Sequence, residues 1–163
     1  KRYDVSVNLI MSRALLWFVS ITIWRGLEKM KIGGPTEIKV NEKRVFLAPK
    51  SCSELIDAGH NISAQQGAGA GIATSYEDYV AAGAEIMPDA VSIFSNVNTT
   101  VKVKEPQRFE CSQLSSEQIL FTYLHRAANS RQAAGLMSSG CTTIAYEIII
   151  DAQGSLPLLV PRS

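Results

Sequence analysis

From Met30 onward, short apolar runs alternate with stretches of helical character, at the spacing of repeated β–α–β units. The apolar runs predict strands at residues 31–34, 61–65, 84–87, 100–104, 118–123 and 142–146. Capping residues and terminal glycines predict helices at 51–58, 75–82, 89–96 and 129–138. Strands that alternate with helices in this order predict the α/β class, with a Rossmann-like parallel sheet that carries helices on both faces.

The first 29 residues do not follow this pattern. Residues 14–24 form an eleven-residue run that is apolar apart from two small hydroxyl residues. This run is too short for a membrane-spanning helix, which needs about 20 residues, and no signal-peptide cleavage site follows it before Arg25. Met30 and the residues after it resemble the natural N-terminus of a protein. We therefore predict an N-terminal extension at 1–29 and one domain at 30–163, with a membrane anchor or a packed helix as alternatives for the extension.

Composition and charge exclude several classes of function. Apolar residues make up 46% of the 163-residue chain and charged residues 19%, which is typical of a folded domain. Sixteen basic and fifteen acidic side chains give a net charge of +1 without a block of like charge, so neither nucleic acid nor a membrane is expected as a partner. Cys52, Cys111 and Cys141 are widely spaced and form no CxxC pair. They are typical of buried thiols in a reducing compartment, which favours a cytoplasmic protein.

Basic side chains near two predicted strands are candidates for binding an anion. Arg44 lies in a loop that leads into an apolar run, where its planar guanidinium matches a small carboxylate in a bidentate pair. A solvated surface arginine is the more common case. Alternation over 101–104 places Lys102 and Lys104 on one face, where a lysine at the end of a strand can hold a carboxylate or polarise a carbonyl. An equal alternative is that the two lysines lie on an edge strand, where their charge prevents pairing with another chain.

The chain contains two histidines in different settings. His125 directly follows an apolar strand, and an imidazole titrates near neutral pH, so it is a candidate for proton transfer. A lone histidine is nevertheless more often structural. His60 follows a helix-ending glycine, which predicts ordinary compensation of the helix dipole.

A glycine cluster at 67–71 follows the second predicted strand. It lacks the G-x-G-x-x-G spacing of a dinucleotide loop, because the sixth position is Ile72 counted from Gly67 and Thr74 counted from Gly69. We interpret the cluster as a turn. The sequence also contains no serine-hydrolase elbow, no P-loop and no metal motif, so no metal is expected.

Several of these stretches together resemble the amino-terminal part of the alanine dehydrogenase family, from Met30 to the last residue. They are the strings at 30–39, 41–45, 67–69, 82–86, 101–106, 118–125 and 143–147. The most specific are KVKEP at 102–106 and ILFTYLH at 119–125. The related transhydrogenase α subunit shares the fold and some of the opening segment but departs at these two strings, so it is the second choice.

The resemblance implies an NAD-dependent interconversion of L-alanine with pyruvate and ammonia. Arg44 and Lys104 would bind the carboxylate and carbonyl side of the substrate, and His125 would be the general acid and base at the imine and carbinolamine steps. A second cation near His125 would lower its pKa and keep it basic near neutral pH. The family forms homo-oligomers, namely hexamers.

The sequence also departs from the family. Arg162 stands where the family has a methionine near the substrate pocket, and Arg126 replaces an apolar residue. The family binds NAD in a separate domain and completes the substrate domain with a returning segment, and this sequence contains neither. We therefore expect a sheet that is incomplete at its C-terminal end and a chain that is inactive alone. A non-functional product of a degenerate reading frame is a further alternative.

Overall fold

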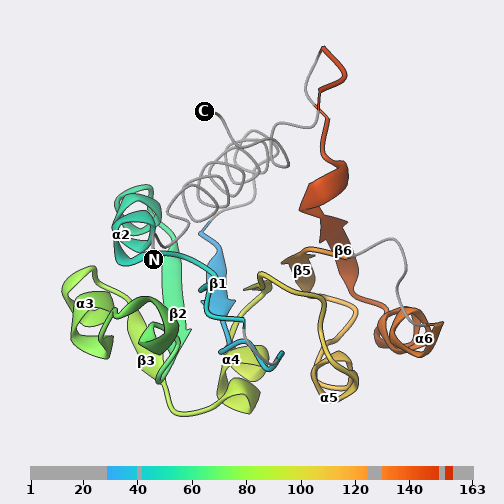
Figure 1. Cartoon of the computed structure of the whole chain (residues 1–163), viewed down its shortest axis with the longest axis horizontal. Helices are drawn as coiled ribbons and strands as arrows, with labels where there is room; N and C mark the ends of the chain where they lie inside the picture. The colour runs from blue at the N-terminus through green and yellow to red at the C-terminus, as the bar shows by residue number, and fades with distance from the viewer. Residues whose placement is uncertain (1–28, 40–41, 125–129, 151–152, 156–163) are drawn as a thin grey trace.

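The computed structural model describes residues 29–39, 42–124, 130–150 and 153–155, and they form a six-stranded sheet (Figure 1). Its strands are β1 (Lys31–Gly34), β2 (Asn61–Gln65), β3 (Glu85–Met87), β4 (Thr99–Val101), β5 (Ile119–Thr122) and β6 (Thr142–Ala145). Apart from Lys29, the predicted extension at 1–29 lies outside the described residues.

The strands follow the order β3-β2-β1-β4-β5-β6, and every neighbouring pair is parallel. In this register Ile32 of β1 lies beside Ile62 of β2 on one side and Thr99 of β4 on the other. The direction of winding therefore reverses between β1 and β4. Open α/β sheets bind ligands at such a switch point, beyond the carboxyl ends of the strands. The predicted α/β class and parallel sheet are confirmed.

Helices cover both faces of the sheet, as the sequence predicts. They are α2 (Pro49–Asp57), α3 (Tyr76–Ala81), α4 (Ala90–Asn96), α5 (Arg108–Cys111) and α6 (Ser130–Ser139). On one face, Leu55 of α2 and Tyr79 of α3 belong to the larger core. On the other face, Phe94 of α4 and Leu136 of α6 pack with Leu120 of β5. Burial of these apolar side chains is the main force that holds the helices to the sheet.

Two glycines allow close packing on both faces of β1. A Cβ on Gly33 would lie 2.7 Å from Cγ1 of Val97, and a Cβ on Gly34 would lie 1.8 Å from Cγ of Phe46. Successive residues of a strand point to opposite faces, so these two contacts lie on opposite sides of the sheet. The space that a side chain would need at either position is therefore already filled.

Two helices differ from the predictions. α2 begins at Pro49, two residues before the predicted cap Ser51, because proline lacks an N–H and so suits the first helical position. The short helix α5 is not predicted at all. Its start is held by a capping box in which the Gln107 N–H donates to Oε2 of Glu110 at 2.7 Å.

The fourth strand is shorter than predicted, since β4 ends at Val101 and not at Lys104. The Lys102 N–H still donates to the Phe121 carbonyl at 2.9 Å, but the Val103 N–H donates to Oε1 of Glu37 at 2.6 Å. At Val103 a hydrogen bond to a side chain therefore takes the place of a backbone hydrogen bond of the sheet. Because β4 lies between β1 and β5, the alternative of a charged edge strand is wrong.

His60 is buried, with 4% of its surface exposed, and its Nδ1 accepts the Met30 N–H at 3.3 Å. Burial lowers the pKa of the imidazole, because the charged ring would lose its hydration. A neutral ring does not supply the positive charge that compensation of a helix dipole requires. The prediction for His60 is therefore wrong, and the residue packs between the end of α2 and the start of β1.

This burial predicts a pH-dependent stability. The pKa of His60 is lower in the folded chain than in the unfolded chain, so the unfolded chain binds more protons below about pH 6.5. The free energy of unfolding should fall as the pH is lowered from 7 to 5.5. His60→Asn keeps an acceptor near the Met30 N–H and should reduce this slope in denaturant titrations. An unchanged slope in the variant would contradict the prediction.

The cysteines agree in part with the prediction of buried thiols. Cys52 and Cys111 are buried and Cys141 is half-buried, and all three are free. Burial raises the pKa of the Cys52 thiol to about 12, which leaves it unreactive at neutral pH. Within the described residues, no helix has both the length and the apolar character needed to cross a membrane.

Candidate functional site

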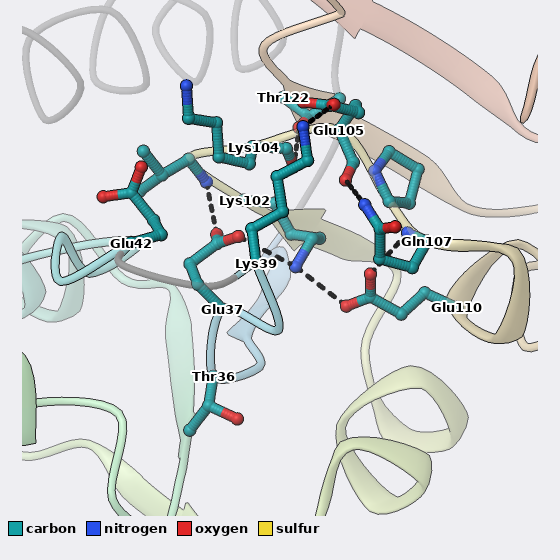
Figure 2. Close-up of polar contacts among 12 residues, drawn as sticks. Thr36, Glu37, Lys39, Glu42, Lys102, Lys104, Glu105, Gln107, Glu110 and Thr122 are labelled. Carbon is teal, nitrogen blue, oxygen red and sulfur yellow. Dashed lines mark hydrogen bonds and ion pairs between the residues drawn. The ribbon is translucent and has the colours of Figure 1, made fainter. Parts of the chain in front are cut away.

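The loops that leave β1 and β4 meet at the switch point of the sheet, and three charged side chains join them. Lys102 directly follows β4, and its Nζ lies 3.2 Å from Oε2 of Glu37 and 2.8 Å from Oε1 of Glu110. Figure 2 shows Lys102 between the two carboxylates. The three side chains are 0–3% exposed, so this charge cluster is shielded from water. It links the β1 loop, the end of β4 and α5.

The charge balance in this cluster is not even, because two carboxyl groups face one ammonium group. Burial raises the pKa of Glu37, and the nearby charge of Lys102 only partly offsets this effect. Glu37 therefore holds a proton more readily than an ordinary glutamate. A lysine between two buried carboxyl groups stabilises the fold only while all its partners remain in place.

The chain from Lys102 to Lys104 is fixed by four further groups. The Val103 N–H donates to Glu37, and the Val103 carbonyl accepts the Tyr146 hydroxyl at 3.0 Å. The Lys104 carbonyl accepts the Thr122 hydroxyl at 2.8 Å. Together with the bond from the Lys102 N–H to β5, these contacts orient the backbone that carries Lys104. The backbone that carries the Lys104 side chain is therefore held in place.

Lys104 is half-buried, and its Nζ lies 5.6 Å from the centre of the Tyr123 ring. Such a contact attracts an ammonium group weakly, by about 0.5–1 kcal/mol at an exposed site. Within the part of the chain that the structure describes, Lys104 forms no ion pair. Lys104 stays a predicted binding residue, and no ion pair among the described residues neutralises its charge.

Arg44 lies in the loop before the buried run 45–47, and its guanidinium pairs with Glu42. Nε donates to Oε1 at 2.8 Å, a terminal nitrogen donates to Oε2, and the Arg44 N–H donates to Oε1 at 3.0 Å. Burial alone would raise the pKa of Glu42, but the hydrogen bonds from Arg44 and the charges of Arg44 and Lys104 lower it below its usual range. Arg44 thus holds the carboxylate of Glu42 in a bidentate geometry, and its binding of a ligand carboxylate stays a prediction.

The glycine cluster supports this loop. A Cβ on Gly71 would lie 2.5 Å from the carbonyl oxygen of Lys43, and a Cβ on Gly69 would lie 2.3 Å from that of Thr74. The glycines therefore make room for the chain's own backbone, which agrees with a turn. The cluster follows β2 and not β1, and the position of a Cβ on Gly34 is filled by Phe46. The positions that a phosphate would need at Gly34, Gly69 and Gly71 are thus occupied by the chain itself.

Three positions named from the sequence cannot be located. His125 and Arg126 fall in 125–129, and Arg162 falls in 156–163, so all three lie outside the described residues. Arg44 pairs with Glu42, and the charge of Lys104 contributes to lowering the pKa of Glu42. Sequence reasoning missed Glu37, Glu42 and Glu110. The signal that could have revealed Glu37 is its place just after the first strand, next to the switch point.

Comparison with known proteins gives consistent matches. The family model described as the alanine dehydrogenase/PNT N-terminal domain matches residues 33–163. Alanine dehydrogenases of Mycolicibacterium smegmatis and Halomonas elongata are 48% and 46% identical over 134 residues, which are 82% of this chain and 36% of each relative. The chain thus spans about a third of the length of these relatives.

Solved structures give the same result for the fold. An L-alanine dehydrogenase structure matches with a TM-score of 0.76 at 45% identity, over 80% of this chain and 36% of that chain. A transhydrogenase from Sinorhizobium meliloti matches with a TM-score of 0.67 at 25% identity, over 72% of this chain and 35% of that chain. Both matches have the parallel α/β sheet in common with this chain.

Proposed function

The chain belongs to the alanine dehydrogenase/PNT N-terminal domain family, and we propose that it is the substrate-binding part of an L-alanine dehydrogenase. The whole enzyme would convert L-alanine, NAD and water into pyruvate, ammonia and NADH. The observation that carries the proposal is the pair of cations at the switch point: Arg44 binds the carboxylate of Glu42, and the charge of Lys104 helps to lower the pKa of the same carboxylate. Two cations that act on one carboxylate can also hold the carboxylate of alanine or pyruvate.

The proposed roles follow from the chemistry of a keto acid. Arg44 binds the substrate carboxylate, because a planar guanidinium donates two parallel hydrogen bonds to it. Lys104 acts at the carboxylate and carbonyl side, where an ammonium group stabilises the negative charge that develops on oxygen. His125 moves protons at the imine and carbinolamine steps, and this role rests on the family resemblance alone.

NAD supplies the hydride chemistry of the whole enzyme. At Gly69 and Gly71 of the glycine turn, protein backbone fills the space that a phosphate of NAD would need. We propose that a domain outside this sequence binds NAD, so that this chain by itself performs no hydride transfer. The proposal includes a cytoplasmic location and a homo-oligomeric full-length enzyme, as the family resemblance implies.

Thermal unfolding with and without pyruvate tests the proposal. Pyruvate at 100 times its Kd should stabilise the chain by about 2.7 kcal/mol, because it binds only the folded state. We expect Arg44→Ala and Lys104→Ala to abolish this stabilisation. Lys43→Ala is the matched control, because Lys43 lies beside Arg44 but its side chain is exposed. If both variants retain the full shift, Arg44 and Lys104 do not bind the substrate.

The second candidate is a piece of a transhydrogenase α subunit, which the Sinorhizobium meliloti structure supports. Its identity of 25% is well below the 45–48% of the alanine dehydrogenases. A cooperative melt that pyruvate does not shift would favour the transhydrogenase. Absence of any cooperative melt would favour the non-functional product of a degenerate reading frame.

A further inference from the structure

We propose that the Glu42 carboxylate occupies the carboxylate subsite of this protein, so that a ligand must displace it from Arg44 before binding. The inference rests on the proposed function for the identity of the ligand. Glu42 then sets the affinity for the substrate, because it competes with the substrate for Arg44 and does not bind the substrate itself.

The geometry of the pair supports this role. Nε and a terminal nitrogen of Arg44 both donate to Glu42, one to each carboxylate oxygen. This is the arrangement in which a guanidinium binds the carboxylate of a small acid. A ligand carboxylate cannot form the same two bonds while Glu42 holds them. Arg44 therefore has to release Glu42 when it binds a keto acid.

The burial and the charges around the Arg44–Glu42 pair also support a carboxylate subsite at Glu42. The Glu42 side chain is only 8% exposed, while that of Arg44 is 32% exposed. Glu42 therefore lies on the inner side of the pair, and the charge of Lys104 acts on it as well. A carboxylate that Arg44 binds and whose pKa Lys104 helps to lower occupies a position that also attracts a ligand carboxylate.

A purely structural role for the pair is less consistent with its location. Glu42 and Arg44 are two residues apart in one loop, so the pair connects no separate elements. The cluster around Lys102, by contrast, links residues 65 positions apart. Removing the Glu42 charge should therefore leave the packing of the sheet and helices intact. It should mainly change how often Arg44 is available.

The availability of Arg44 sets the measured affinity. When only a fraction of molecules is competent to bind, the apparent Kd is the intrinsic Kd divided by that fraction. If Glu42 occupies Arg44 in about nine molecules of ten, its loss should lower the apparent Kd roughly tenfold. We expect Glu42→Gln to bind pyruvate on the order of tenfold more tightly than the parent chain, measured by isothermal titration calorimetry.

Glu105→Gln is the matched control. Glu105 also loses a negative charge in this variant, and its pKa is also lowered in part by Lys104, but it pairs with Lys39 and not with Arg44. An equal gain in affinity in both variants would show a general effect of charge and would overturn the inference. Weaker binding in Glu42→Gln would show that Glu42 orients Arg44 and would overturn it as well.

A second measurement is independent of pyruvate. Phenylglyoxal modifies free guanidinium groups, and mass spectrometry of chymotryptic peptides can follow Arg44, with the exposed Arg108 as an internal reference. Arg44 should react at least severalfold faster in Glu42→Gln than in the parent or in Glu105→Gln. An equal rate in all three chains would overturn the inference. If Arg44 reacts faster but no chain binds pyruvate, the occupied subsite stands and the proposed substrate is wrong.

Discussion

Replacing Lys102 with methionine is expected to lower the free energy of unfolding by about 3–5 kcal/mol, because the variant leaves two carboxyl groups buried without their cation. Glu37 and Glu110 are 3% and 0% exposed, so water does not solvate them in place of Lys102. Methionine fills a similar volume, so the loss reflects charge more than packing. Denaturant titration at neutral pH measures this loss.

The pH dependence of the loss separates charge from shape. In the variant Glu37 loses the charge of Lys102 that partly offsets its raised pKa, so this pKa rises further and the fold is weakened most at high pH. The loss should be larger at pH 8 than at pH 5. Lys50→Met, at an exposed position of α2, should change stability by no more than about 0.5 kcal/mol. A pH-independent loss at Lys102 would show that packing is the cause.

Gly34→Ala is expected to be the second severe substitution, with a loss of about 3 kcal/mol or more. The added Cβ would lie 1.8 Å from Cγ of Phe46, and this ring is 1% exposed and belongs to the larger core. Either the β1 strand or the Phe46 ring has to move. Thermal or denaturant unfolding of the variant measures the loss.

A double-mutant cycle identifies the contact responsible. Phe46→Leu removes the ring that meets the new Cβ, at the cost of some apolar packing. The double variant Gly34→Ala/Phe46→Leu should be more stable than the sum of the two single losses indicates. Additive losses would show that the added methyl group does not meet Phe46.

The strands could be predicted because local signals mark them. Short segments that lie between glycines or prolines, such as 61–65 between Gly59 and Gly67, coincide with strands in the structure. The end of β4 could not be predicted in this way. Residues 101–104 alternate as a strand does, but the Val103 N–H bonds to the side chain of Glu37, which is 66 residues away. Local alternation contains no information about that bond.

The site could be predicted only in part for the same reason. Arg44 and Lys104 stand in strings that resemble a known family and are predicted as site residues. Glu37 stands in the string at 30–39 without a predicted role, and Glu110 stands in none of these strings. Their importance depends on β1 and β4 being neighbours in the sheet. The hydrophobic pattern of a strand does not show which other strands lie beside it. The order of the strands in the sheet therefore cannot be inferred from periodicity. The buried charge cluster becomes visible only with the tertiary structure.

The place of β1 in the strand order has a consequence for biosynthesis. β1 is the first described strand, and β2 pairs with one of its edges soon after it is made. Its other edge pairs with β4, and just before β4 the Asn98 side chain accepts the Lys31 N–H, 67 residues later in the chain. At about 5–20 residues per second, a ribosome takes roughly 3–13 s to make that stretch. Throughout this interval one edge of the central strand is without its partner, and a nascent chain is open to mispairing at that edge.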